Sequence, residues 1–136
     1  MVKRMYVLPN LFWEGLGFGS YPSVKNRGFI VAQKDLVSTI YTHLKKLGLN
    51  SQESADFMDF WHSILPKSDY VRLTWLNTKE MDTLAPLIVS PKPDSIIRIF
   101  LDAAPAQKDD QLIPQNLTSI PRTGFTLIEW GGLLIK

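Results

Sequence analysis

The sequence predicts an α+β domain in which a mainly antiparallel sheet carries an α-helical hairpin on one face. Two amphipathic helical segments follow one another, at about 36–47 and 51–65. Apolar segments with strand-like composition lie before and after them, at 28–32, 70–76, 95–101 and 124–130. Helices grouped between runs of strands are typical of this class. The length of 136 residues is close to the commonest size of one domain, so we expect a single domain over 1–136.

The first strands are expected before the helices. Residues 4–8 and 11–14 are short apolar segments separated by Pro9-Asn10, and 28–32 follows a glycine-rich connection. Each has the length and composition of a short strand, and the Pro-Asn pair is typical of a turn.

The first helix is predicted by apolar residues at helical spacing, at positions 36, 37, 40, 41, 44 and 47. Asp35 is expected to cap its N-terminus, and Gly48 stands where a glycine ends many helices. Asn50 and Glu53 have the spacing of a capping box, which predicts the start of the second helix. Pro66 ends it. The short link predicts an antiparallel hairpin.

Five residues are expected on the apolar face of the second helix: Phe57, Phe60, Trp61, Ile64 and Leu65.

The second half of the chain is expected to be mostly β. Residues 70–76 alternate between apolar and polar, and 78–84 has the character of a short helix. The "SPKPDS" segment predicts a chain reversal between antiparallel strands at 87–89 and 95–101. Three prolines predict a long surface loop over 103–121. The last strand, 124–130, is expected to continue at 133–135 beyond Gly131-Gly132.

The composition excludes several classes of function. The net charge is +2, and the basic residues are scattered rather than gathered in a stripe, which disfavours nucleic acid as a partner. The absence of cysteine excludes disulfides, thiolate metal sites and a cysteine nucleophile. Pro9, Asn10 and Glu14 interrupt the apolar run that a signal peptide needs, and no segment is apolar enough for a membrane span. The compartment stays open.

Two Glu-Trp neighbours, in "FWEG" at 12–15 and "EWGG" at 129–132, are the candidate catalytic feature. Glu14 and Glu129, beside Trp13 and Trp130, have the residue types of a glycosidase: two carboxylates and aromatic platforms for sugar. The competing interpretation is structural: a glutamate at a strand end pairs with an arginine, and Arg27, Arg98 and Arg122 are available. We favour the structural interpretation.

His43 and His62 are the only histidines, one on each predicted helix. Together with Asp56 or Asp59 they have the donor types of a zinc site. Both aspartates are expected on the outer helix face, so we favour histidines at the edge of the apolar face and expect no metal and no cofactor.

The aromatic residues favour binding to another protein. Tyrosine and tryptophan at a surface are enriched at protein interfaces. The expected contact residues are Trp13, Phe18, Tyr21 and Trp130.

The order of "LFWEG", "GFIV", "FMDFW", "APLIVSPKPDSIIRIF" and "PRTGFTLIEWGG" resembles an uncharacterised domain of large secreted or surface-anchored bacterial and archaeal proteins. The resemblance extends from Leu11 to Gly132, and "SPKPD" and "GFTLIEWGG" are its most specific parts. It implies a C-terminal module that follows other extracellular domains, and it carries over no activity and no catalytic residue.

Three functions follow, in order of preference. The first is a non-catalytic interaction or structural module, with a protein partner or self-association; if the chain is a module of a longer protein, it would belong to an extracellular or cell-surface assembly. The second is a small carbohydrate-active or hydrolytic enzyme that uses Glu14 and Glu129. The third is a regulatory or nucleic-acid binder that uses Arg72 and Arg98 on one sheet face.

Overall fold

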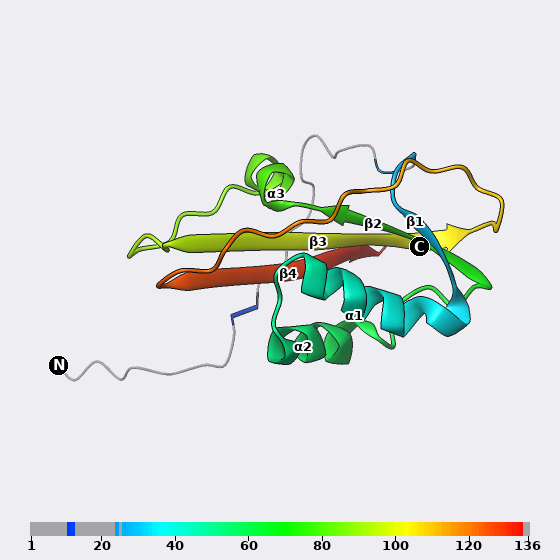
Figure 1. Ribbon diagram of the computed structural model, residues 1–136, viewed down its shortest axis with the longest axis horizontal. Coiled ribbons are helices and arrows are strands. Elements are labelled where there is room, and N and C mark those ends of the chain that lie inside the picture. The colour runs from blue at the N-terminus through cyan, green and yellow to red at the C-terminus, as the bar shows by residue number, and fades with distance from the viewer. Residues whose placement is uncertain (1–10, 13–23, 25, 135–136) are drawn as a thin grey trace.

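The computed structural model describes residues 11–12, 24 and 26–134, and these form a four-stranded mixed sheet with helices on both faces (Figure 1). The strands are β1 (Phe29–Ala32), β2 (Tyr70–Leu76), β3 (Ser95–Ala106) and β4 (Thr126–Leu134), in the spatial order β1-β2-β3-β4. The first two neighbouring pairs are antiparallel, and β3 and β4 are parallel. The α+β class and the mostly antiparallel sheet are confirmed.

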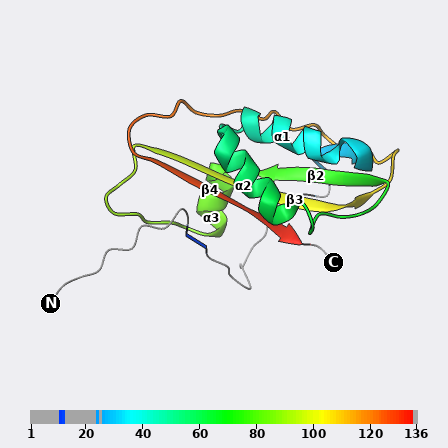
Figure 2. The same cartoon turned by 90° about the horizontal axis from the view of Figure 1, so that it is seen from below.

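The helices α1 (Leu36–Lys46) and α2 (Ser51–Trp61) lie on one face of the sheet, and the short α3 (Thr78–Leu84) lies on the other. A single 3-10 turn, η1 (Gln33–Asp35), leads from β1 into α1. Figure 2 shows α1 and α2 in front of the sheet, with α2 crossing over β3 and β4. The predicted hairpin on one face is therefore present. Among the described residues, no helix has both the length and the apolar character needed to cross a bilayer.

Local sequence signals explain how the hairpin is built. At the end of α1, the N–H of Gly48 donates to Lys45 and the N–H of Leu49 donates to Leu44, which is a Schellman motif. Gly48 has a φ of 98°, a value that side chains disfavour. Asn50 and Glu53 form the expected capping box, with the Asn50 side chain accepting from Glu53 N–H at 2.9 Å.

Two helix boundaries differ from the prediction. The Asp35 side chain makes no capping hydrogen bond, because residues 33–35 already form the 3-10 turn that precedes α1. The helix α2 ends at Trp61, four residues before the predicted Leu65. Both Ile64 and Leu65 donate to the carbonyl of Trp61, so the chain turns there before it reaches Pro66.

Alternation along the strands divides the sheet into two chemically different faces. The residues that face α1 and α2 are apolar and make one core with the helices; from the strands they include Val71, Leu73, Trp75, Ile97, Ile99 and Leu101. The opposite face combines a small apolar cluster of Val24, Leu76 and Met81 with buried charged residues. This second face contains most of the polar side chains considered below.

The strands after α3 differ most from the prediction. Residues 87–89 are not a strand, so the expected antiparallel pair with 95–101 is wrong. The strand β3 continues to Ala106 and pairs with all seven residues of β2. Its partner β4 starts at Thr126 and continues through Gly131 and Gly132, as expected. Because β3 and β4 are parallel, residues 107–125 form a long crossover, which replaces the predicted loop over 103–121.

Side-chain contacts attach this crossover to the body of the protein. The Gln115 amide accepts from the N–H of Trp75 and donates to its carbonyl, both at 2.8 Å, beyond the end of β1. Leu117 packs on the main core, and Arg122 pairs with Glu53 at the start of α2. The amide of Gln115 therefore satisfies main-chain groups that β1 is too short to reach.

Candidate functional site

The Glu129 carboxylate is bound to a buried arginine. Arg98 on β3 is directly opposite Glu129 on β4, its side chain is 1% exposed, and its Nε donates to Glu129. The same guanidinium donates to Asp82 of α3 at 2.9 Å. Burial alone would lower the pKa of Arg98, but its hydrogen bonds to Glu129 and Asp82 outweigh burial and raise that pKa. Arg98 is therefore a cation held by two carboxylates.

This arrangement bears directly on the candidate catalytic pair. A glycosidase acid must be free to exchange its proton with the substrate, whereas both oxygens of the Glu129 carboxylate accept hydrogen bonds from Arg98. Glu129 lies within β4 rather than at a strand end, and it pairs with Arg98, one of the three arginines named above, as the structural interpretation expects. Glu14 and Trp13 lie outside the described residues.

The second buried arginine, Arg72, is held in a similar way on the same sheet face. Its guanidinium donates to Asp102 Oδ1 at 2.7 Å and to Thr74 Oγ1, and Asp102 is fully buried. A hollow of about 410 Å³ lies beside Arg72, between the end of β3 and residues 110–112. Arg72 and Arg98 do share one face, but both are buried and paired with carboxylates. Neither offers an open cationic surface for a phosphate backbone.

His43 is buried rather than at the solvent edge of α1, which corrects the prediction. It is 7% exposed, and its Nδ1 accepts a hydrogen bond from Trp75 Nε1 at 3.0 Å. The ring of Phe29 lies 4.5 Å from the imidazole, centre to centre. Burial, assisted by the charge of Lys46, lowers the pKa of His43 to about 4. His43 is thus a neutral core residue at pH 7.

The described residues do not bring together the donor types considered for a zinc site. His62 is exposed at the end of α2, whereas His43 faces Trp75 in the core. Among residues 11–12, 24 and 26–134, no three histidine, aspartate or glutamate side chains gather to hold a metal ion.

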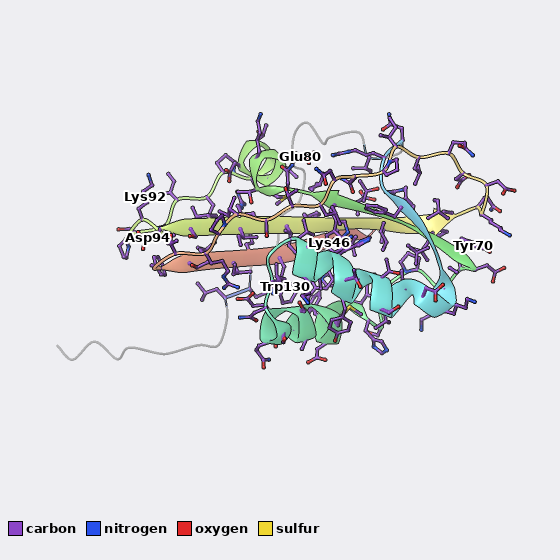
Figure 3. All side chains as sticks on the ribbon, viewed as in Figure 1. Lys46, Tyr70, Glu80, Lys92, Asp94 and Trp130 are labelled. Atoms are coloured by element: carbon purple, nitrogen blue, oxygen red, sulfur yellow. The ribbon has the colours of Figure 1, made fainter. Side chains whose placement is uncertain are left out.

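An aromatic cluster reaches from the core to the surface where α2 crosses β4. Trp130 packs against Phe57 and Phe60 with ring centres 5.4 and 6.1 Å apart, and Figure 3 places Trp130 between β4 and α2. Phe60 also contacts Phe12, at 6.3 Å. Phe12 is 72% exposed and Phe60 is 42% exposed. We call Phe12, Phe60 and Trp130 the aromatic surface.

Only part of this surface was predicted. Trp130 was an expected binding residue, whereas Phe18 and Tyr21, like Trp13, lie outside the described residues. Phe60 was assigned to the buried face of α2, but the buried positions are 54, 57, 58 and 61. The buried arc of α2 therefore includes Met58 and leaves Phe60 outside it. Ile64, also expected inside, is exposed because α2 has already ended.

Comparison with known proteins gives no relative: no family model, no curated protein and no solved structure matches this chain. The functional argument therefore depends on the geometry of the described residues.

Proposed function

We propose that the protein is a non-catalytic interaction module that binds another protein through the aromatic surface. The observation that carries the proposal is the exposure of Phe12 and Phe60 over a half-buried Trp130. Exposed aromatic side chains that continue a packed core resemble the anchors of protein interfaces, which are rich in tryptophan and other aromatic residues. Ordinary soluble surfaces show large apolar side chains singly.

The electrostatics favour binding over catalysis. The Glu129 carboxylate, the one described member of the candidate catalytic pair, accepts hydrogen bonds from the buried Arg98 guanidinium, which favours a structural role for it. Asp82 and Asp102 are likewise paired with arginines. The resemblance of the sequence to a module of secreted and surface-anchored proteins favours a partner within an extracellular or cell-surface assembly.

The experiment compares two single substitutions in quantitative affinity capture from the organism's own extract. Phe60→Ser removes the centre of the aromatic surface, and Val37→Ser is the matched control, because Val37 is 43% exposed on α1. We expect a partner that is retained by the wild type and by Val37→Ser but lost with Phe60→Ser. Equal retention by all three proteins, with Phe60→Ser still folded by circular dichroism, would show that binding does not use this surface.

A further inference from the structure

The outer edge of β1 has main-chain groups available for pairing. The N–H of Gly28 points away from β2 and donates to the carbonyl of Ile113 at 3.0 Å. The N–H of Gln33 points toward the β2 side and donates to the carbonyl of Asp69. Main-chain groups alternate sides along a strand, so both observations place the N–H and C=O of Ile30 on the outer side. Arg27, which precedes β1, forms an isolated bridge with Ile113. Among the described residues, no strand pairs with Ile30 on the side of β1 that faces away from β2.

This free edge forms one wall of a trough whose other wall is α1. The trough has a volume of about 500 Å³ and is lined by Phe29–Ala32 together with Asp35, Ser38, Thr39 and His43. The chain runs in opposite directions along β1 and α1. The start of β1 is beside the later part of α1, where the ring of Phe29 packs on His43. The end of β1 at Ala32 connects through η1 to the start of α1. Extended peptides bind proteins by adding a strand to an exposed sheet edge of this kind.

His43 provides a directed hydrogen-bond donor at one end of the trough. The indole of Trp75 can only donate, so Nδ1 of His43 is the acceptor and Nε2 of the neutral ring carries the hydrogen. Nε2 has no partner among the described residues. Trp61 Nε1 is the only described side-chain nitrogen or oxygen that is both fully buried and without a partner. Nε2 of His43 therefore keeps solvent contact, and His43 is one of the residues that line the trough.

The charges of α1 give the trough two different ends. Lys46 follows His43 by one helical turn, and its charge acts on the imidazole. Asp35 lies at the opposite end, beside Ala32. An acceptor group with negative charge is thus favoured at the His43 end and disfavoured at the Asp35 end.

We propose that this trough binds an extended segment of a partner protein as an additional strand on β1, with a carboxylate side chain of that segment at the His43 and Lys46 end. The main chain of Ile30 supplies strand pairing, and His43 Nε2–H and Lys46 select the carboxylate. The site is on the edge strand opposite β4 and shares no residue with the aromatic surface, so it does not depend on the proposed function.

The test uses short peptides of alternating valine and threonine, blocked at both termini, added to the full chain labelled with ¹⁵N. One peptide carries glutamate near its N-terminus and a second near its C-terminus, which covers both strand directions. Matched peptides carry glutamine instead, or are N-methylated at alternate residues so that they cannot pair. We expect NMR shifts at Ile30, Ala32, Thr39 and His43. Glutamate should give about two- to fivefold tighter binding than glutamine in the preferred direction. N-methylation should abolish binding.

Variants locate the site. Thr39→Trp fills the trough and should abolish binding at about 1 mM peptide, whereas Val37→Trp, on α1 outside the trough, should leave it unchanged. Lys46→Gln should weaken the preference for glutamate without changing binding of the glutamine peptide, and it remains informative if Thr39→Trp does not fold. The proposal is overturned by no shifts at about 1 mM, by equal binding of the N-methylated peptide, or by shifts confined to the aromatic surface.

Discussion

Acid should destabilise the folded protein specifically through His43. The imidazole is neutral in the fold because its pKa is lowered from 6.5 to about 4, chiefly by burial and next by the charge of Lys46. Above pH 6.5 His43 is neutral in both the folded and the unfolded chain, so it has no effect on stability. Between pH 6.5 and about 4 the unfolded chain binds a proton that the folded chain does not. Stability should therefore fall as the pH falls through this window.

The pKa difference sets the size of the effect. A pKa difference of one corresponds to about 1.4 kcal/mol, so lowering the pKa from 6.5 to about 4 costs about 3 kcal/mol of unfolding free energy by pH 4. Since a small domain is stable by only about 5–15 kcal/mol, this loss should be readily measurable. Protonation also removes the acceptor of the Trp75 indole, so the folded form cannot gain the proton without losing that hydrogen bond.

Urea unfolding at pH 7 and pH 4, followed by tryptophan fluorescence, measures this loss. Carboxylates also titrate in the window, so the control is His43→Gln, which keeps an acceptor for Trp75 Nε1 but does not titrate. We expect the wild type to lose about 3 kcal/mol more than His43→Gln between the two pH values. If both proteins lose the same free energy, the assignment of His43 as a buried neutral base is wrong.

Three further predictions concern packing and the buried charges. Glu129→Gln should lower the unfolding free energy by about 2–3 kcal/mol, because it weakens the ion pair with buried Arg98. The Arg98→Met, Glu129→Leu double variant should recover part of that loss. An unchanged unfolding midpoint in the single variant would contradict a structural role for Glu129. Gly28→Ala should cost more than about 1 kcal/mol, since φ is 124° and a Cβ would lie 2.2 Å from the Leu73 carbonyl oxygen. Gly131→Ala should cost less than Gly28→Ala in the same thermal melt, since its Cβ would meet only the Phe100 ring, at 3.1 Å.

Features set by neighbours in the chain were predictable from the sequence. The capping box of Asn50 and Glu53 and the glycine at 48 depend on hydrogen bonds within a few residues, so their spacing identifies them. The strand at 70–76 was also found, because its apolar side chains alternate with Arg72 and Thr74. The polar positions of that strand are nevertheless buried: Thr74 donates to the main-chain carbonyl of Arg27, and Arg72 pairs with Asp102.

Features set by distant contacts were not predictable. The apolar segment 87–89 has strand composition but pairs with no strand in the part of the chain that the structure describes, whereas β3 continues through Pro105. The register explains why this proline is tolerated: the last described pair between β3 and β4 is Ala103 with Leu134, so among the described residues no β4 residue pairs with Pro105. The pairing of Arg98 with both Glu129 and Asp82 likewise depends on a parallel neighbour and a helix that only the tertiary fold brings together.

The candidate interaction residues show the same limit. A helical wheel places Phe60 near the apolar stripe of α2, but the inward direction is fixed by the sheet, which selects Phe57 and Trp61. The sequence singles out Trp130 beside a glycine pair, although β4 continues through that pair to Leu134. Its packing against α2 depends on the crossing of α2 over β4.

The most direct test of the interaction surface is photo-crosslinking from position 60. A benzophenone analogue of phenylalanine replaces Phe60 in one protein and Val37 in the other, and each is irradiated in the extract that contains the partner. The proposed function predicts a crosslinked species from position 60 and none from position 37. Crosslinking from position 37 alone, or equal yields from both positions, would contradict it.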